Sequence, residues 1–178
     1  MMAALFVLLL LITLGFIAYA VRLRNALVRM RNNIDKSFAG IDVLLKQRHD
    51  ELPKLLETCR PYLEHEQSAL RSLAEARSGY ARATSPSQKA QADQLVSSAV
   101  RSLFAVAAKN PELKKSASFI QLQARIVQLG EKVNAQRDRY NEDVNSFNAR
   151  LAQIPHAFVA RLTKLRAREP FQASVAKQ

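Results

Sequence analysis

The stretch FIQLQARIVQLGEKVNAQRDRYNEDVNSFNARLAQI, residues 119–154, carries the longest regular pattern in the sequence. Mostly apolar residues recur along it at intervals of three or four, which is the spacing of one face of an α-helix. The members of this seam are Phe119, Leu122, Ile126, Leu129, Val133, Gln136, Tyr140, Val144, Phe147, Leu151 and Ile154. Because a helix that is apolar on one side is not stable alone, the pattern predicts a long helix packed against others.

Helical spacing also extends through the chain before this stretch. A stripe runs from residue 23 to residue 45 and resumes at Leu52, Leu55 and Cys59, with Pro53 and Pro61 expected to kink or restart the helix. A second helix is expected from Tyr62 to about residue 83, and a third over 87–109 with Ser87 as a candidate N-cap. The face assigned to the third helix consists of Leu95, Ala99, Leu103 and Val106.

These patterns predict an all-α protein. No stretch combines alternation of apolar and polar residues with the β-branched residues typical of strands, and no Asn-Gly or Asp-Gly hairpin turn occurs. Short connections at 84–87 and 110–111 favour antiparallel neighbours. We therefore expect an N-terminal transmembrane helix, residues 1–21, that continues into an antiparallel bundle of three to four long helices over residues 22–168. A short basic amphipathic piece follows Pro155, and residues 169–178 are expected to form a flexible tail.

The transmembrane prediction rests on the first 21 residues, MMAALFVLLLLITLGFIAYAV, which carry no charge. About 20 such residues in a helix span about 30 Å of hydrocarbon. A cleaved signal peptide is the alternative, since Ala18-Tyr19-Ala20 resembles a cleavage site. The absence of Lys or Arg before the apolar run, and the length of that run, favour the anchor.

Four arginines follow the apolar segment at once: Arg22, Arg24, Arg29 and Arg31. Since cytoplasmic flanks carry the excess of basic residues, this order predicts a single-pass protein with its N-terminus outside and its bundle in the cytoplasm. The alternative for the arginines is a solvated helix face, and the two interpretations are compatible. Basic side chains at this level can also attract anionic lipid.

Several stretches resemble the signatures of the LemA family. They are LVRMRNNID at 27–35, IDVLLKQRHD at 41–50, LPKL at 52–55, FIQLQ at 119–123 and RYNEDV at 139–144, followed by Asn148 and Pro155. The departures are Phe38, where the family often has Trp, His49, where Tyr is common, and Ile154-Pro155-His156, where Phe-Pro is usual. The resemblance implies a bacterial, membrane-anchored helical bundle, here placed in the plasma (inner) membrane, and implies no settled activity.

Polar residues within these signatures are candidate site residues: Asp35, Asp42, Arg139, Tyr140, Asn141 and Asn148. They could form a polar site between two helices, or they could pair helices and set their register, as buried polar groups do in coiled coils. We favour the second interpretation. It predicts that Asp35 or Asp42 pairs with Arg137 or Arg139, that the hydroxyl of Tyr140 reaches a partner such as an Asp, and that Asn148 fixes register.

The sequence offers no constellation for catalysis, a metal or a cofactor, and we expect none. Its histidines, His49, His65 and His156, lack the Glu-x-x-His spacing of di-iron bundles. The run Glu64-His65-Glu66 cannot converge on one ion, because consecutive helical positions point about 100° apart. The single cysteine, Cys59, continues an apolar stripe, where a thiol is usually a core residue rather than a nucleophile.

Charge separates the remaining function classes. The chain has 178 residues, of which 27 are Lys or Arg and 15 are Asp or Glu, a formal net charge of +12. The pI near 10.3 suggests a nucleic-acid binder. However, no DNA- or RNA-binding signature appears, and the basic excess concentrates beside the apolar segment and toward the C-terminus. We therefore expect a membrane-anchored, non-enzymatic scaffold or adaptor with protein partners and contact with anionic lipid. A homo-oligomer through the 119–154 seam is an alternative, and nucleic acid is disfavoured.

Overall fold

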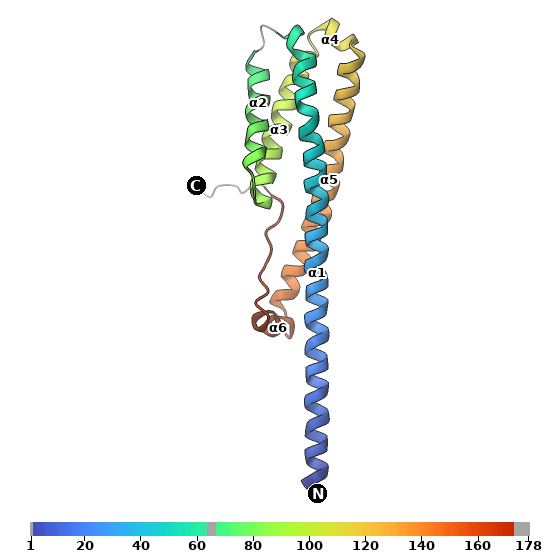
Figure 1. The fold of residues 1–178 in the computed structure, drawn as a ribbon, viewed down its shortest axis with the longest axis vertical. Helices are drawn as coiled ribbons and strands as arrows, with labels where there is room; N and C mark the ends of the chain where they lie inside the picture. Colours follow the sequence, from blue (N-terminus) through green and yellow to red (C-terminus); the bar gives the residue numbers. More distant parts are fainter. Residues whose placement is uncertain (1, 64–66, 173–178) are drawn as a thin grey trace. The chain divides into compact units, whose positions relative to one another are not determined.

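The computed structural model describes residues 2–63 and 67–172, and within these ranges it contains helices and no strand. The elements are α1 (Met2–Cys59), the 3₁₀ helix η1 (Arg60–Tyr62), α2 (Gln67–Arg82), α3 (Pro86–Ala107), α4 (Pro111–Lys115), α5 (Ala117–Ala152) and α6 (His156–Leu162) (Figure 1). The predicted all-α class is confirmed. The short helix α4 was not predicted.

The long first helix passes through one proline and ends near the other. Pro53 lies inside α1, whereas Pro61 lies in η1, where the helix tightens and stops. A proline within a helix removes one backbone hydrogen bond, so packing must hold the helix there. Leu52 and Leu55, on either side of Pro53, are both fully buried, and this burial explains why the expected restart does not occur at Pro53.

The start of α3 is capped by Ser85, so the prediction of Ser87 as N-cap is wrong. The Ser85 hydroxyl accepts a hydrogen bond from the Gln88 amide at 3.1 Å, and the Gln88 side chain accepts one from the Ser85 amide at 3.2 Å. Pro86 occupies the first helical position, where its missing N–H costs nothing. This reciprocal capping box starts the helix two residues earlier than expected.

The described chain forms two compact units, to which α1 and α5 both contribute. Unit 1 comprises the residues up to Lys36 together with Glu142–Arg168, and unit 2 comprises Ser37–Asn141 together with the residues from Glu169 onward. The predicted boundary between anchor and bundle concerns the environment of each segment, and it stays a prediction.

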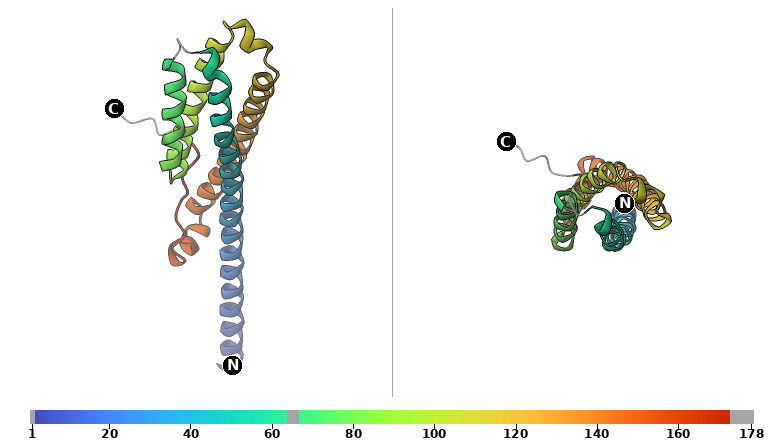
Figure 2. Two further views of the ribbon diagram at one scale, coloured as in Figure 1. Left: turned by 45° about the horizontal axis from the view of Figure 1, so that its top comes forward. Right: turned by 90° about the horizontal axis from the view of Figure 1, so that it is seen from above.

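Unit 2 is a helical bundle with a continuous apolar core. In Figures 1 and 2, α2 and α3 lie side by side along the second half of α1. The core takes side chains from α1, α2, α3, α4 and α5, including Leu55, Leu73, Leu103, Leu113 and Ile126, all fully buried. Burial of this kind contributes about 25 cal/mol per Å² of apolar surface, and it is the main stabilising contribution to such a bundle.

The predicted seam on α5 is confirmed over most of its length. Its buried members are Phe119, Ile126, Leu129, Val133, Tyr140, Val144 and Phe147. Ile154 is an exception, because it lies beyond the end of α5 and is 90% exposed. The face assigned to α3 is also partly wrong: Leu95 is 59% exposed, while Val96 and Val100 are buried beside the correctly predicted Leu103.

In unit 1, most apolar side chains of α1 before residue 22 are exposed. Among the described residues, α1 is the one helix long and apolar enough to cross a membrane, with a mean hydropathy of 2.7 in its most apolar stretch. None of that stretch is buried. The buried part of unit 1 lies further along and takes Leu27 and Ile34 from α1, Val144 and Phe147 from α5, and Ala160 from α6.

The beginning of the predicted flexible tail is held in place. Phe171 is 1% exposed and is therefore part of the folded structure of unit 2. The chain stays attached to α5 on both sides of Pro170, because the Glu169 carbonyl and the Phe171 N–H are both hydrogen-bonded to side chains of α5. The prediction is thus wrong for residues 169–172, and residues 173–178 lie outside the described residues.

Candidate functional site

Two of the predicted site residues, Tyr140 and Asn141 of α5, bind the backbone of the C-terminal segment in unit 2. The Tyr140 hydroxyl donates to the carbonyl of Glu169 at 2.8 Å. The Asn141 amide oxygen accepts from the Phe171 N–H at 2.7 Å, and its NH₂ group donates to the Phe171 carbonyl at 3.5 Å. An amide side chain can satisfy both groups of one residue in this way, much as a neighbouring strand would.

Asn148 makes the corresponding contact in unit 1. Its amide oxygen accepts from the Arg168 N–H and its NH₂ group donates to the Arg168 carbonyl, both at 2.9 Å. These polar residues of α5 therefore fix the irregular segment that follows α6. The predicted role of Asn148 in helix register is replaced by a role in holding non-helical backbone, whose groups need partners when they are covered.

The predicted pairing of Asp35 or Asp42 with Arg137 or Arg139 is wrong. In unit 1, Asp35 accepts from Arg168 at 2.7 Å and also lies near Arg31. In unit 2, Arg137 pairs with the neighbouring Asp138 at 3.6 Å, and Arg139 is exposed. Arg137 and Arg139 therefore do not carry the predicted pairing, whereas another arginine of α5, Arg125, pairs with the buried Glu51 of α1 at 2.7 Å.

Asp42 instead forms a polar cluster with Tyr80 and Lys89 in unit 2. It accepts a hydrogen bond from the Lys89 ammonium group and one from the Tyr80 hydroxyl at 3.5 Å. Burial of the phenol, together with the nearby Asp42 carboxylate, raises the pKa of Tyr80 to about 12. The Lys89 ammonium also lies 5.4 Å from the centre of the Phe38 ring. Since α1, α2 and α3 each supply one member, the cluster links these three helices.

Sequence reasoning missed a buried ion pair in unit 2. The Arg48 guanidinium donates to Asp93 at 2.6 Å and to the Ser97 hydroxyl at 2.9 Å, and the Arg48 side chain is only 8% exposed. Burial raises the pKa of Asp93 above its usual value, although Arg48 opposes the shift. The sequence does carry a sign of this pair, because Arg48 occupies the stripe position between Leu45 and Leu52, where an apolar residue was expected.

The described residues include one cysteine, Cys59, and two histidines, His49 and His156. Cys59 is fully buried, as its stripe position predicted, and burial raises the pKa of its thiol to about 11. The reactive thiolate is therefore scarce at neutral pH. The His49 ring donates to the Arg77 carbonyl at 3.1 Å. Within residues 2–63 and 67–172, no group of three His, Cys, Asp or Glu side chains is placed to hold a metal ion. The run Glu64-His65-Glu66 lies outside the described residues.

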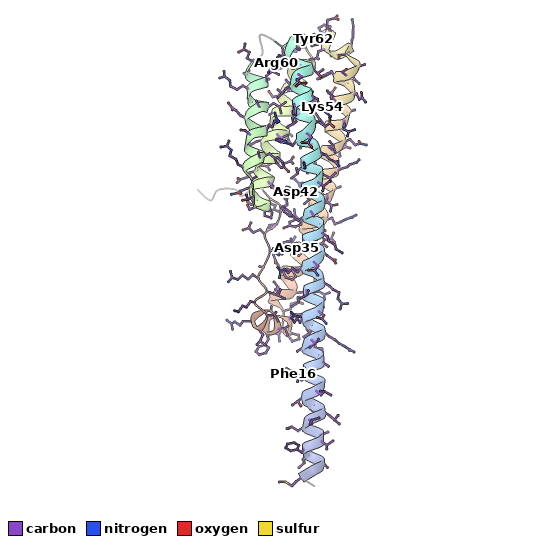
Figure 3. The ribbon with its side chains drawn as sticks, viewed as in Figure 1. Phe16, Asp35, Asp42, Lys54, Arg60 and Tyr62 are labelled. Atoms are coloured by element: carbon purple, nitrogen blue, oxygen red, sulfur yellow. The ribbon has the colours of Figure 1, made fainter. Side chains whose placement is uncertain are left out.

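An apolar groove lies on the surface of unit 1, and we call it the α1–α6 groove. It has a volume of about 830 Å³, and its walls include Phe16 and Val21 of α1 and Phe158 and Leu162 of α6. Figure 3 labels Phe16 on its part of α1. Arg24 and Arg161 are the charged residues of its lining. Arginines predicted to flank a membrane, Arg22, Arg24, Arg29 and Arg31, are all exposed.

Comparison with known families identifies the chain. The model of the LemA family matches residues 37–178, which is most of the sequence. The protein belongs to the LemA family. Membership confirms the resemblance of residues 41–55 and 119–155, whereas the resembling stretch at 27–35 lies before the matched region. No curated protein matches the chain.

Proposed function

We propose that this LemA-family protein is a membrane-anchored, non-enzymatic scaffold that holds a helical bundle at the cytoplasmic face of a bacterial plasma membrane. One observation carries the proposal: the apolar stretch of α1 is exposed on all sides and is followed at once by exposed arginines. Water does not tolerate such a stretch, whereas hydrocarbon does, and the arginines suit the cytoplasmic boundary.

The anchor and its orientation are tested in native membranes. We expect the full chain to stay with the membrane after carbonate extraction and to keep residues 1–21 in the mature protein. A reporter fused to the C-terminus should be active only in the cytoplasm. Loss of residues 1–20 by cleavage would support a signal peptide instead, and a reporter active outside the cytoplasm would invert the topology.

The scaffold role predicts protein partners at unit 2. A photo-crosslinking residue at Leu95, which is exposed although apolar, should capture the same membrane-associated proteins repeatedly. The same crosslinking residue at Glu112, whose side chain is 75% exposed on α4, tests a second surface of unit 2. If neither position captures a protein in living cells, the scaffold role is contradicted.

A second candidate is a tethered nucleic-acid binder, which the charge of +12 supports. The two functions differ in a binding assay with the full chain reconstituted in neutral vesicles. The scaffold function predicts no salt-sensitive capture of duplex DNA, and the alternative predicts strong capture at low salt. A homo-oligomer remains a further prediction, but the α5 seam that suggested it is largely buried within its own chain.

A further inference from the structure

The short helix α6 presents apolar side chains outward in unit 1. Phe158 is 66% exposed and Leu162 is 76% exposed. Since they are four residues apart, they lie on one face of the helix. Ile154, just before α6, is 90% exposed. Large apolar side chains gathered in this way indicate a surface that is covered in the working protein.

The α1–α6 groove joins this face to the apolar stretch of α1. Its α1 wall runs from Phe16 to Arg24, so it begins in the proposed membrane anchor and ends at the first arginines. The rise from Phe16 to Val21 is about 7.5 Å at about 1.5 Å per residue. Interfacial helices bury their apolar face about 5–10 Å into the boundary between headgroups and acyl chains. The groove therefore lies at the depth of the upper acyl chains of the bilayer.

Basic side chains line the groove and a pocket next to it. Arg24 and Arg161 belong to its lining. A neighbouring polar pocket of about 230 Å³ is formed by Arg31 and by residues 164–168, which include three further basic side chains. Asp35 pairs with Arg31 and Arg168, and the remaining two, Lys164 and Arg166, are exposed. Apolar walls with positive groups at one end match the structure of an anionic phospholipid.

The backbone at Lys164 closes α6 in a Schellman motif, in which the Lys164 N–H donates to the Arg161 carbonyl and the Leu165 N–H donates to the Ala160 carbonyl. Its φ of 55° lies in the left-handed region, which costs a side chain other than glycine about 1 kcal/mol or more. Lys164 follows Thr163, the C-cap of α6, and begins the segment that Asn148 holds. Glycine would make this turn at lower cost, but it would remove the ammonium group from the pocket.

We propose that the α1–α6 groove binds an anionic phospholipid of the cytoplasmic leaflet. An acyl chain lies between Phe16 and Phe158, and the phosphate lies against Arg24, Arg161 and the Lys164–Arg168 turn. The proposal rests on the membrane anchorage proposed above. It commits to lipid because one wall of the groove belongs to the anchor, where lipid is the solvent, and because the charges are complementary.

The test uses the absence of tryptophan from the sequence. Three single-tryptophan variants of the full chain, F16W, F158W and L95W, are reconstituted in vesicles that contain phospholipid brominated on the acyl chains. We expect bromine to quench F16W and F158W and to leave L95W, on unit 2, unquenched. At equal mole fraction, brominated phosphatidylglycerol should quench F158W more strongly than brominated phosphatidylcholine.

The variant K164G/R166S tests the basic end of the site in the F158W background. Its matched control is K109N/K132S, which removes the same charge from exposed positions of unit 2. Each cation near an anionic surface contributes about fivefold to local lipid enrichment, so K164G/R166S should abolish most of the preference for phosphatidylglycerol. The control should keep it. Glycine at position 164 suits the local backbone, so a loss there does not reflect misfolding.

The possible failures are distinguishable. If F16W is not quenched, the anchor itself is outside the bilayer and the proposed function fails. If F16W is quenched but F158W is not, the anchor stands and the lipid site is contradicted. If both are quenched equally by the two lipids, or if the control variant loses the preference as well, selective binding of anionic lipid is contradicted.

Discussion

The first helix of this protein places two kinds of apolar sequence in two environments. Residues 2–21 are apolar on every side, and most of their side chains are exposed. From Leu27 to Cys59 the same helix is apolar on one stripe, and that stripe is buried. The comparison separates two apolar patterns: a stripe, which packed helices cover, and a full circumference, which the proposed anchorage would cover with lipid.

The comparison predicts the largest loss of folding free energy at Arg48, the charged residue that occupies an apolar position in the buried stripe of α1. The variant D93A leaves Arg48 without its buried partner, and such a loss costs about 3–5 kcal/mol of folding free energy. Urea unfolding of the detergent-solubilised protein, followed by circular dichroism, measures it. D138A removes an exposed carboxylate on α5 and should cost about 1 kcal/mol or less. Equal effects of the two variants would show that the Arg48–Asp93 pair is not buried in solution.

The next prediction compares the free energies of unfolding of two leucine-to-alanine variants, one on each part of α1. L55A truncates a fully buried side chain and should lower the free energy of unfolding of the bundle by about 2–5 kcal/mol. L10A makes the same chemical change at a side chain that is 55% exposed, and it should leave bundle unfolding unchanged. The same urea titration serves for both. A bundle destabilised by L10A would mean that residues 2–21 pack on protein rather than on lipid.

A smaller effect is expected at the start of α3. S85A removes one half of the capping box and should cost about 0.5–2 kcal/mol. S98A, a matched change at an exposed serine within α3, should cost less, because its hydroxyl only bonds back to the preceding turn. Thermal unfolding of the two variants checks the order. If S98A is the more destabilising variant, the assignment of Ser85 as the cap is contradicted.

The smallest effect is a change in titration. The absorbance of tyrosinate is measured against pH for the wild type and for Y80F, and the difference between the two curves reports Tyr80. This difference should titrate near pH 12 rather than near 10. Because the pKa is raised in the folded state, its contribution to stability is complete below pH 10 and is lost as the pH rises through 12. D42N should lower the pKa of Tyr80 while burial keeps it above 10. No change in D42N would contradict the contact.

Much of the fold was predictable because helical periodicity is local. The spacing of residues 119–147 determines which face of α5 is buried, and this needs no knowledge of its partners. The contacts of Asn141 and Asn148 were not predictable in the same way, because they depend on where a non-helical segment comes to lie. The end of the seam shows the same limit: Ile154 keeps the spacing, but the helix ends before it.

The candidate polar residues show what residue type alone leaves open. Asp35 and Asp42 are seven residues apart on one helix, yet they bind different groups in different units. Arg48 was identifiable in principle, since a charge within an apolar stripe requires a buried partner. Asp93 as that partner was not, because the register between α1 and α3 depends on the packing of the whole bundle.

The central claim is that residues 2–21 are exposed to lipid and that the later part of α1 is not. Two single-cysteine variants in a C59A background test it directly, L11C and N33C, because both positions are exposed in the structure. In native membranes treated with a membrane-permeant maleimide, N33C should react readily, and L11C should react only after the bilayer is dissolved, since the thiolate does not form in hydrocarbon. Equal labelling of L11C and N33C in intact membranes would contradict the account.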